Sequence, residues 1–340
     1  MLEGGPRRVR IGVMGAGVTS QLMHLPILTE RADVEVTAIS DLDVVKGQAV
    51  AERFGVPRVL SDDELIAADE IEGVVVCAPS FLHESFASAC LEGGKHVLVE
   101  RPLALSPGGA RHLLEVARAT GKGVLPGLSH RYQANVRALR SAIAEGALGE
   151  IGTARVTWLN RAVRRPRTGW RRRALESGGG ALMDLGVPAL DLALWVLGCP
   201  EVDRVTATTR GDGFDVEEEA HLHAVTHDGT AVTLAASWRL HAPRDRHRLW
   251  VLGSEGSARL SPLSIYKQVG GRTVNITPRQ PIPRGGEDHF TNGYRRLLDE
   301  FVRVVGGTAA ARPPVDQIGL MRLVEAAYEA AHEAREVKLS

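Results

Sequence analysis

The spacing of hydrophobic and polar positions changes near residue 127. Before it, short apolar runs rich in valine alternate with stretches whose apolar residues recur at helical spacing. Runs of this kind are typical of parallel strands buried on both faces, and the stretches between them of crossover helices. The pattern predicts strands at residues 9–14, 34–40, 72–78, 96–99 and 123–125, a weak strand at 58–60, and helices at 19–30, 44–54, 62–68, 82–92 and 107–120.

After residue 127, one more helix at 133–145 precedes long segments in which apolar and polar residues alternate. Alternation predicts strands of a sheet that is covered on one face. Asp228-Gly229 separates two such segments, 216–226 and 231–238, and predicts a tight hairpin turn. Further strands are expected at 151–161, 202–209, 248–252, 257–260 and 272–276, and helices at 181–197, 289–305 and 315–333.

These patterns predict an α/β protein of two domains, with a first domain at residues 1–127 and a second at 128–340. The last helix belongs to the second domain in this scheme. Packing of that helix back onto the first domain is the alternative.

Composition narrows the possible functions. Forty-one basic residues balance 41 acidic ones, so no overall field favours nucleic acid or an anionic membrane surface. No apolar run reaches the length of about 18 residues that spans a membrane. Three cysteines without a Cys-x-x-Cys pair, and the isolated pair His221 and His223, predict neither a disulfide framework nor a metal site. A cytoplasmic protein is therefore expected.

The first strand leads into a glycine turn typical of dinucleotide binding. Gly15 permits a tight turn, and Gly17 lets backbone N–H groups approach a pyrophosphate at the following helix, which begins near Val18. Ser20 takes the place of the third glycine of the fingerprint. Asp41 ends the second strand, where a carboxylate binds the hydroxyls of an adenosine ribose. NAD is favoured because Asp41-Leu42-Asp43 would repel a 2′-phosphate, and NADP stays open since a basic residue can arrive from elsewhere.

Several motifs together resemble the glucose-fructose oxidoreductase/inositol dehydrogenase/rhizopine catabolism family. They are Gly15-Ala16-Gly17, His24-Leu25-Pro26, Ala78-Pro79 with His83, the segment 94–102, His130-Arg131-Tyr132, the segment 146–151, the segment 178–186 with Asp191, and Gly253 with Glu255-Gly256. The resemblance implies a Rossmann domain with a parallel sheet, then an α/β domain with a large, mostly antiparallel open sheet. It also implies a homodimer or homotetramer built through that sheet, and a small-molecule substrate held between the domains over the nicotinamide. The cofactor contacts carried over are Ala78, Pro79, His83, Glu100 and Arg101.

Two positions depart from the family pattern. The strand that usually ends Glu-Lys-Pro reads Glu100-Arg101-Pro102, and the histidine that usually follows the second-domain aspartate, Asp184, is Pro188. The resemblance implies that the lysine and the histidine usual at these two positions are proton carriers. A guanidinium stays charged at any working pH and proline has no titratable group, so Arg101 can polarise an oxygen but cannot deliver a proton.

Other residues must then handle the proton. Asp184 is the first candidate, and an ion pair of Asp184 with Arg101 is the structural alternative. His130 and Tyr132 are further catalytic candidates because they follow the last strand of the first domain. The alternative for each is a structural role, as a hydrogen-bonded residue in the wall of the site.

A basic segment at 161–173 holds seven arginines and indicates an anionic or sugar-like substrate. A solvated loop paired with acids such as Glu217, Glu218 and Glu219 is the simpler explanation. The expected substrate contacts are Arg131, Arg167, Trp170, Arg172 and His241.

The sequence thus predicts an NAD(P)-dependent oxidoreductase that exchanges hydride with a small polar substrate, sugar-like, cyclitol or anionic. Two alternatives follow from the replaced residues. One is a sensor or partner-binding module that keeps the cofactor pocket without turnover. The other is an enzyme that uses tightly bound NAD transiently in a lyase or hydrolase cycle.

Overall fold

The computed structural model describes residues 7–164, 169–212, 215–281 and 286–339. The chain divides into two compact units. The first unit comprises Met1–Ala104, Gly108–Ser129 and Phe290–Val315, and the second comprises Leu105–Pro107, His130–His289 and Asp316–Ser340. The segment Phe290–Val315, which the sequence assigned to the second domain, thus belongs to the first unit, and the final helix lies in the second.

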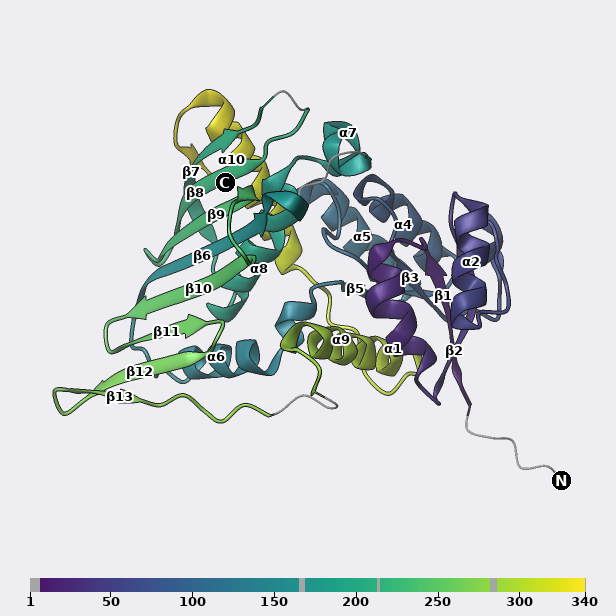
Figure 1. Cartoon of the computed structure of the whole chain (residues 1–340), viewed down its shortest axis with the longest axis horizontal. Coiled ribbons are helices and arrows are strands. Elements are labelled where there is room, and N and C mark those ends of the chain that lie inside the picture. Colours follow the sequence, from purple (N-terminus) through teal and green to yellow (C-terminus); the bar gives the residue numbers. More distant parts are fainter. Residues whose placement is uncertain (1–6, 165–168, 213–214, 282–285, 340) are drawn as a thin grey trace. The chain divides into compact units, whose positions relative to one another are not determined.

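The first unit is built on a five-stranded parallel sheet in the order β2-β1-β3-β4-β5 (Figure 1). The apolar runs form its strands because nearly every residue in them is buried between helices. The strands are β1 (Val9–Met14), β2 (Val34–Ser40), β3 (Gly73–Val76), β4 (His96–Val99) and β5 (Val124–Pro126). At 58–60, where a weak strand was expected, the structure has one parallel bridge, between Ile39 of β2 and Val59. With this segment placed beside β2, the strand order is that of a Rossmann sheet.

Helices flank this sheet on both faces. They are η1 (Ser20–His24), α1 (Leu25–Thr29), α2 (Val44–Phe54), α3 (Asp62–Ala67), η2 (Ser80–Leu82), α4 (His83–Glu92), α5 (Pro107–Thr120) and α9 (His289–Val305). The last of these returns from far along the chain and packs beside α1, where Arg31 pairs with Asp299 and the rings of His24 and Tyr294 meet edge to face. A returning helix thereby becomes part of the first unit.

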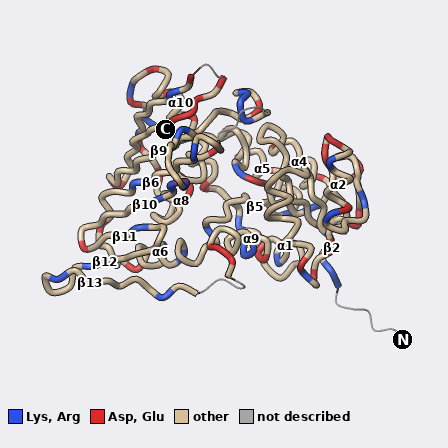
Figure 2. Tube along the Cα trace, viewed as in Figure 1, with Lys and Arg blue, Asp and Glu red and all other residues tan. Residues whose placement is uncertain are grey.

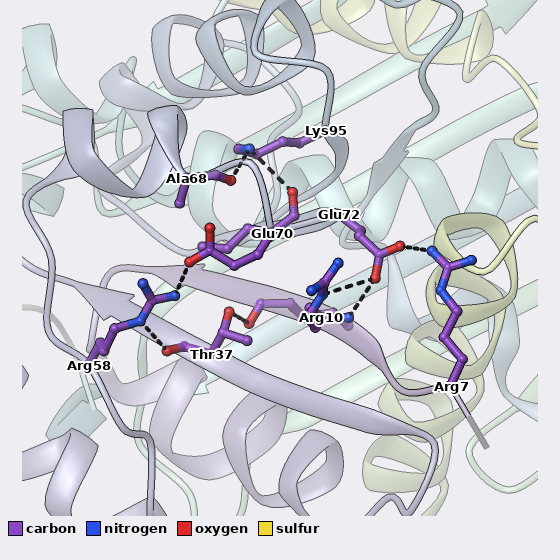
Figure 3. Close-up of polar contacts among 10 residues, drawn as sticks. Arg7, Arg10, Thr37, Arg58, Ala68, Glu70, Glu72 and Lys95 are labelled. Atoms are coloured by element: carbon purple, nitrogen blue, oxygen red, sulfur yellow. Dashed lines mark hydrogen bonds and ion pairs between the residues drawn. The ribbon is translucent and has the colours of Figure 1, made fainter. Parts of the chain in front are cut away.

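Charged side chains tie together the edge of the sheet where its strands begin (Figure 3). Glu72 pairs with Arg7 and Arg10, and Arg58 pairs with Glu70. Lys95, only 2% exposed, donates from Nζ to the carbonyl of Ala68 at 2.8 Å. This edge lies opposite the carboxyl ends of the strands, where ligands bind in open α/β sheets.

The second unit contains a nine-stranded sheet in the order β13-β12-β11-β10-β6-β9-β8-β7-β14 (Figure 1). All described neighbours are antiparallel except β6 and β9. The strands are β6 (Ile151–Arg161), β7 (Val202–Arg210), β8 (Glu219–Thr226), β9 (Ala231–Leu240), β10 (Arg246–Gly253), β11 (Gly256–Leu260), β12 (Ser264–Val269), β13 (Arg272–Asn275) and β14 (Val337–Lys338). The hairpin predicted at Asp228-Gly229 joins β8 and β9, with Gly229 at φ +87°.

Besides α9, the described helical segments after residue 128 are η3 (Ser129–Tyr132), α6 (Ala134–Ala144), η4 (Ala162–Arg164), η5 (Trp170–Arg172), α7 (Ala174–Ser177), η6 (Leu182–Gly186), α8 (Val187–Val196) and α10 (Asp316–Glu333). Along the sheet, α10 packs on β7, α8 on β6 and α6 on β11. Successive side chains of a strand point to opposite faces of the sheet. In β10, Leu249 and Val251 are buried on one face, whereas Trp250 and Leu252 are exposed on the other.

Several details differ from the sequence prediction. Strand β12 was not expected, because Ser264–Val269 mixes polar and apolar residues without a long regular run. The two-residue β14 pairs with β7 only through tertiary contact. The strand expected from residue 216 begins at Glu219.

The helical stretch Ala174–Val196 is long and apolar enough for a membrane span, but 83% of its most apolar window is buried inside the protein. It therefore serves as a core helix. Figure 2 shows acidic and basic residues interspersed over both units.

Candidate functional site

The glycine turn has the geometry that a dinucleotide requires. Gly15 has φ +95°, and a Cβ on it would lie 2.6 Å from the carbonyl oxygen of Cys77, so no other residue fits. No described atom lies within 4 Å of the place where Gly17 would carry a Cβ, which leaves the turn open to a phosphate. Ser20, in place of the third glycine, is buried and donates its hydroxyl to the carbonyl of Gly15, so it reinforces the turn.

Asp41 closes the turn from the neighbouring strand. Its Oδ2 accepts the backbone N–H of Ala16 at 2.7 Å, and its Oδ1 accepts that of Asp43 at 2.8 Å. Lys46 places its Nζ 2.8 Å from Oδ1. The predicted ribose-binding carboxylate thus lies directly beside the predicted phosphate-binding turn, and Val18 lies exposed at the start of the helix. This arrangement fits NAD.

His83 joins the loops that follow β3 and β4. Its Nε2 is 2.9 Å from the carbonyl of Ala78, next to Pro79, and its Nδ1 is 2.7 Å from the carbonyl of Pro102. The ring is almost fully buried. Both loops at the carboxyl end of the sheet are therefore held by one side chain, which explains why a histidine suits this position.

Glu100, at the end of β4, is the centre of a buried polar cluster. Its Oε1 accepts from His24 Nε2 at 2.9 Å and from the hydroxyl of Tyr294 at 3.1 Å. Its Oε2 accepts the backbone N–H of Arg101 at 3.2 Å. A Cβ on Gly127 would lie 3.1 Å from the carboxyl group of Glu100. A glycine at position 127 therefore leaves space for that carboxyl group.

His24 and Glu100 shift each other's pKa. Burial alone would lower the pKa of His24, but Cys77 and Glu100 raise it to about 10. Burial would raise the pKa of Glu100, but the hydrogen bond and charge of His24 hold that pKa below its usual range. Both shifts favour the charged forms of the two side chains. Sequence patterns carry no functional signal for Tyr294, because 194 positions separate it from Glu100.

Position 101, which follows β4, holds an arginine and not a lysine. The chain has lysines at 46, 95, 122, 267 and 338. Lys95 is at the opposite end of the same strand, and burial lowers its pKa while it binds the Ala68 carbonyl. Lys122 precedes β5 on that same edge, and Lys267 and Lys338 lie on β12 and β14 of the second unit.

In the second unit, Asp184 lies in the π turn η6. Its Oδ2 accepts the indole N–H of the buried Trp238 at 3.0 Å, and Arg171 Nε lies 3.6 Å from its Oδ1. Pro188 follows in the first turn of α8 and is buried. The carboxylate is therefore fixed by a core residue that sequence patterns did not connect with it.

Glu217 holds the glycine motif that leads into this turn. Its two oxygens accept the N–H groups of Gly180 at 2.9 Å and Leu182 at 2.8 Å, and the hydroxyl of Tyr328 donates at 3.0 Å. Gly180 approaches the Glu217 backbone too closely for any side chain. A fixed loop thus sets the start of the helix that carries Asp184.

His130 and Arg131 both bind one buried carboxylate. His130 Nε2 lies 2.7 Å from Asp191 Oδ2, and Arg131 Nε donates to the same oxygen at 2.8 Å. Arg131 also pairs with Asp316. Burial would raise the pKa of Asp191, but Arg131 and His130 hold it well below its usual range. This geometry orients the His130 ring and commits the Arg131 guanidinium to an internal ion pair.

The other predicted substrate residues are spread over loops of the second unit. Arg172 is buried with its Nη1 3.1 Å from Glu218 Oε1, as the simpler interpretation of the basic segment expects for that arginine. Arg171 stacks over Trp170, and Arg137 over Tyr132, at 4.2 and 5.0 Å from the ring centres. His241 is exposed after β9. Arg167 lies outside the described residues.

Among the residues that the structure describes, no three His, Cys, Asp or Glu side chains gather as metal ligands would. His221 and His223 lie exposed on β8.

Comparison with known proteins identifies the family. Residues 9–128 match the oxidoreductase family with an NAD-binding Rossmann fold, and residues 136–259 match the GFO/IDH/MocA C-terminal domain. The chain belongs to the GFO/IDH/MocA family. The resemblance drawn from the sequence motifs is thereby confirmed, as are the α/β architecture and NAD as the cofactor.

Relatives within the GFO/IDH/MocA family include sugar oxidoreductases. The D-glucoside 3-dehydrogenase of Escherichia coli (strain K12) is 29% identical, over 97% of each chain. The dTDP-3,4-didehydro-2,6-dideoxy-alpha-D-glucose 3-reductase of Streptomyces violaceoruber is 30% identical over 96% of each chain. Among solved structures, GenD2 from gentamicin A biosynthesis in complex with NAD is 30% identical with a TM-score of 0.84, over 100% of both chains.

Proposed function

We propose that this protein is an NAD-dependent oxidoreductase that interconverts a secondary hydroxyl and a ketone on the ring of a sugar substrate. The Ala16–Asp41 contact beside the open glycine turn carries the cofactor part of the proposal. The substrate class rests on relatives named for reactions at position 3 of a sugar.

NAD supplies the hydride acceptor in the oxidative direction. The Gly15–Gly17 turn binds the pyrophosphate and Asp41 the adenosine ribose. Arg101, held through its backbone by Glu100, stabilises negative charge on the reacting oxygen. Asp184 accepts the hydroxyl proton, because its carboxylate is oriented by Trp238 for that role. His130, oriented by Asp191, is the second proton carrier that the geometry favours, and Tyr132 is a weaker candidate.

The substrate contacts follow from the same proposal. Trp170 and His241 come from loops of the second unit, and Arg167 is retained from the sequence. Arg172, expected from the sequence as a contact, is paired with Glu218 and is not assigned to the substrate. The Arg131 guanidinium is bound to Asp191 and Asp316, so we assign it the role of holding His130 rather than of touching substrate.

The experiment combines cofactor binding with turnover. Purified protein is titrated with NADH, and the nicotinamide fluorescence is recorded. NAD reduction is then followed with glucosides, nucleotide-linked glucose and inositols. Asp184→Asn should abolish reduction while NADH still binds. Asp212→Asn, at an exposed aspartate paired with Arg239, serves as the matched control. Binding of NADH without turnover of any sugar would instead favour the sensor module, and NAD retained through purification without net reduction would favour the lyase or hydrolase cycle.

Assembly through the open sheet face belongs to this proposal. Trp250, Leu252 and Tyr266 are exposed large side chains on β10 and β12. Large apolar side chains exposed on a sheet face are typical of a protein interface, and a homodimer or homotetramer would cover them. We also propose that the protein is cytoplasmic.

A further inference from the structure

Three side chains of the first unit form a cysteine–histidine–glutamate arrangement that the proposed reaction does not use. His24 is fully buried, and its Nε2 is 2.9 Å from Glu100 Oε1. Its other ring nitrogen, Nδ1, is also buried and makes no hydrogen bond of normal geometry within the described residues. Cys77 is the side chain that interacts with this ring besides Glu100, because against the effect of burial its thiol raises the pKa of His24. One histidine therefore lies between a thiol and a carboxylate.

Cys77 is fixed beside the glycine turn. It follows β3, and its backbone N–H donates to the carbonyl of Met14 on β1 at 2.7 Å. Its own carbonyl oxygen is 2.6 Å from the place where Gly15 would carry a Cβ, so the two backbones pack closely. Cys77 is half-buried, whereas Cys90 is fully buried. A chemical change at Cys77 therefore alters the surroundings of the turn assigned to the pyrophosphate.

This arrangement favours a reactive thiol. A histidine cation beside a cysteine stabilises the thiolate, which is the form that attacks electrophiles. A carboxylate on the far ring nitrogen orients the imidazole and supports its positive charge, as the third member of a catalytic triad does. Burial disfavours the thiolates of the other two cysteines, because it raises the pKa of Cys90 to about 12 and that of Cys199 to about 11.

We propose that Cys77 is a thiol activated by His24 and Glu100, that hydroperoxides oxidise it to a sulfenic acid, and that this oxidation weakens dinucleotide binding. The sulfur attacks one oxygen of the peroxide, so that an S–O bond forms while the O–O bond breaks. The sulfur loses two electrons, the peroxide gains two, and the leaving oxygen takes the thiol proton. A small dithiol reverses the step: its first thiol displaces water to give a mixed disulfide, and its second releases the Cys77 thiol.

The first test measures the reactivity of the thiol without any cofactor. Wild-type protein, both native and unfolded in urea, is treated with iodoacetamide, and mass spectrometry gives the labelling rate of each cysteine. Cys77 should react faster in the native chain than in the unfolded one, by about threefold or more, because folding brings His24 to it. Cys90 and Cys199 should react more slowly in the native chain. Native labelling of Cys77 that is no faster than labelling of the unfolded chain would overturn the proposal.

A histidine variant tests the cause of the reactivity. His24→Gln should remove the faster native labelling of Cys77, because glutamine keeps a hydrogen-bonding group but carries no charge. His332→Gln, at an exposed position of α10, is the matched control and should be labelled as wild type is. An unchanged labelling rate of Cys77 in folded His24→Gln would contradict activation by the histidine. If His24→Gln does not fold, the comparison of native and unfolded wild type decides.

The second test links oxidation to the cofactor, and this link alone rests on the proposed function. The full chain is treated with hydrogen peroxide. One sample is trapped with dimedone, which marks sulfenic acids, and another is titrated with NADH by calorimetry before and after dithiothreitol. Dimedone should mark Cys77, NADH binding should be lost, and dithiothreitol should restore it. Cys77→Ser should keep its own NADH affinity after peroxide, whereas the matched Cys199→Ser should lose it as wild type does.

Two results of the second test would overturn the proposal. One is peroxide treatment that leaves Cys77 without a dimedone adduct, and the other is oxidation of Cys77 that leaves the Kd for NADH unchanged. Untreated protein that binds no NADH would refute the proposed function and the link to the cofactor, while the labelling rates still decide whether Cys77 is activated.

Discussion

At the residue scale, the main question is how a guanidinium serves where the family pattern has an amine. Arg101 has its backbone N–H fixed by Glu100, and Glu100 is itself fixed by His24 and Tyr294. A guanidinium can stabilise an alkoxide, but it cannot take the proton that leaves with the hydride. The proposed function therefore assigns charge stabilisation and proton transfer to different residues, which the family lysine would combine.

Substitution of Arg101 tests this separation. We expect Arg101→Met to lower kcat by about 100-fold or more, as loss of an oxyanion donor does, with the Kd for NADH nearly unchanged. Arg101→Lys should retain more activity and add a new ionisation to the pH profile of kcat, because an ammonium group titrates. Steady-state kinetics from pH 6 to about 10 would check both. Full activity of Arg101→Met would contradict the assigned role.

The His24–Glu100 pair predicts how stability depends on pH. The pKa of His24 is raised from 6.5 to about 10, so its contribution to stability is complete below pH 6.5 and is lost as the pH rises toward 10. Glu100, whose pKa is lowered from 4.5, contributes above pH 4.5 and loses its contribution as the pH falls.

His24→Gln should therefore reduce the free energy of unfolding near pH 6.5 and differ less from wild type near pH 10. Denaturant unfolding at both pH values measures this. His332→Gln, at an exposed position in α10, is the control and should follow wild type throughout. A constant difference between His24→Gln and wild type would show that the pair is not charged.

At the element scale, two π turns share one construction. The turn Ser20–His24 precedes Leu25-Pro26, and the turn Leu182–Gly186 precedes Val187-Pro188. In each, the next N–H bonds back five residues, from Leu25 to Ser20 and from Val187 to Leu182. A proline lacks the N–H that an α-helix needs there, so a wider turn accommodates it. One turn positions His24 and the other Asp184.

The glycine turn gives a prediction at the same scale. Gly15→Ala should destabilise the first unit, because its Cβ would press on the carbonyl of Cys77 at a positive φ. Gly17→Ala should leave the melting temperature within about 2 °C of wild type but weaken NADH binding, since the added methyl occupies the open side of the turn. Calorimetric melting and NADH titration of both proteins would separate folding from binding. Equal NADH affinity in Gly17→Ala and wild type would contradict the assigned pyrophosphate site.

At the scale of the whole molecule, the residues named in the proposed function come from both units. The first unit contains the glycine turn, Asp41 and Arg101, and the second contains Asp184 and the His130–Asp191 pair. The second unit also presents an open sheet face. There Arg259 stacks on Trp250 with its guanidinium carbon 5.5 Å from the ring centre.

We expect Trp250→Asp to shift the protein toward the monomer, because a charge at the centre of an apolar interface loses solvation without a partner. Light scattering after size-exclusion chromatography gives the mass directly. Leu175→Asp changes an equally apolar, 94% exposed residue of α7 away from this face, and should not alter the mass. A monomeric wild-type protein would rule out assembly through the sheet.

The sequence by itself determined the features that depend on neighbouring residues: the parallel and alternating strands, the glycine turn with Asp41, the Asp228-Gly229 hairpin and the motifs of the family. These follow from periodicity and backbone preference within a few positions. Only the tertiary structure decided that Tyr294 supports Glu100 from 194 positions away, that Trp238 orients Asp184 and that Arg131 is bound to Asp191 rather than exposed. Such contacts are chosen by burial, because a polar group removed from water takes whichever partner the folded chain brings within reach.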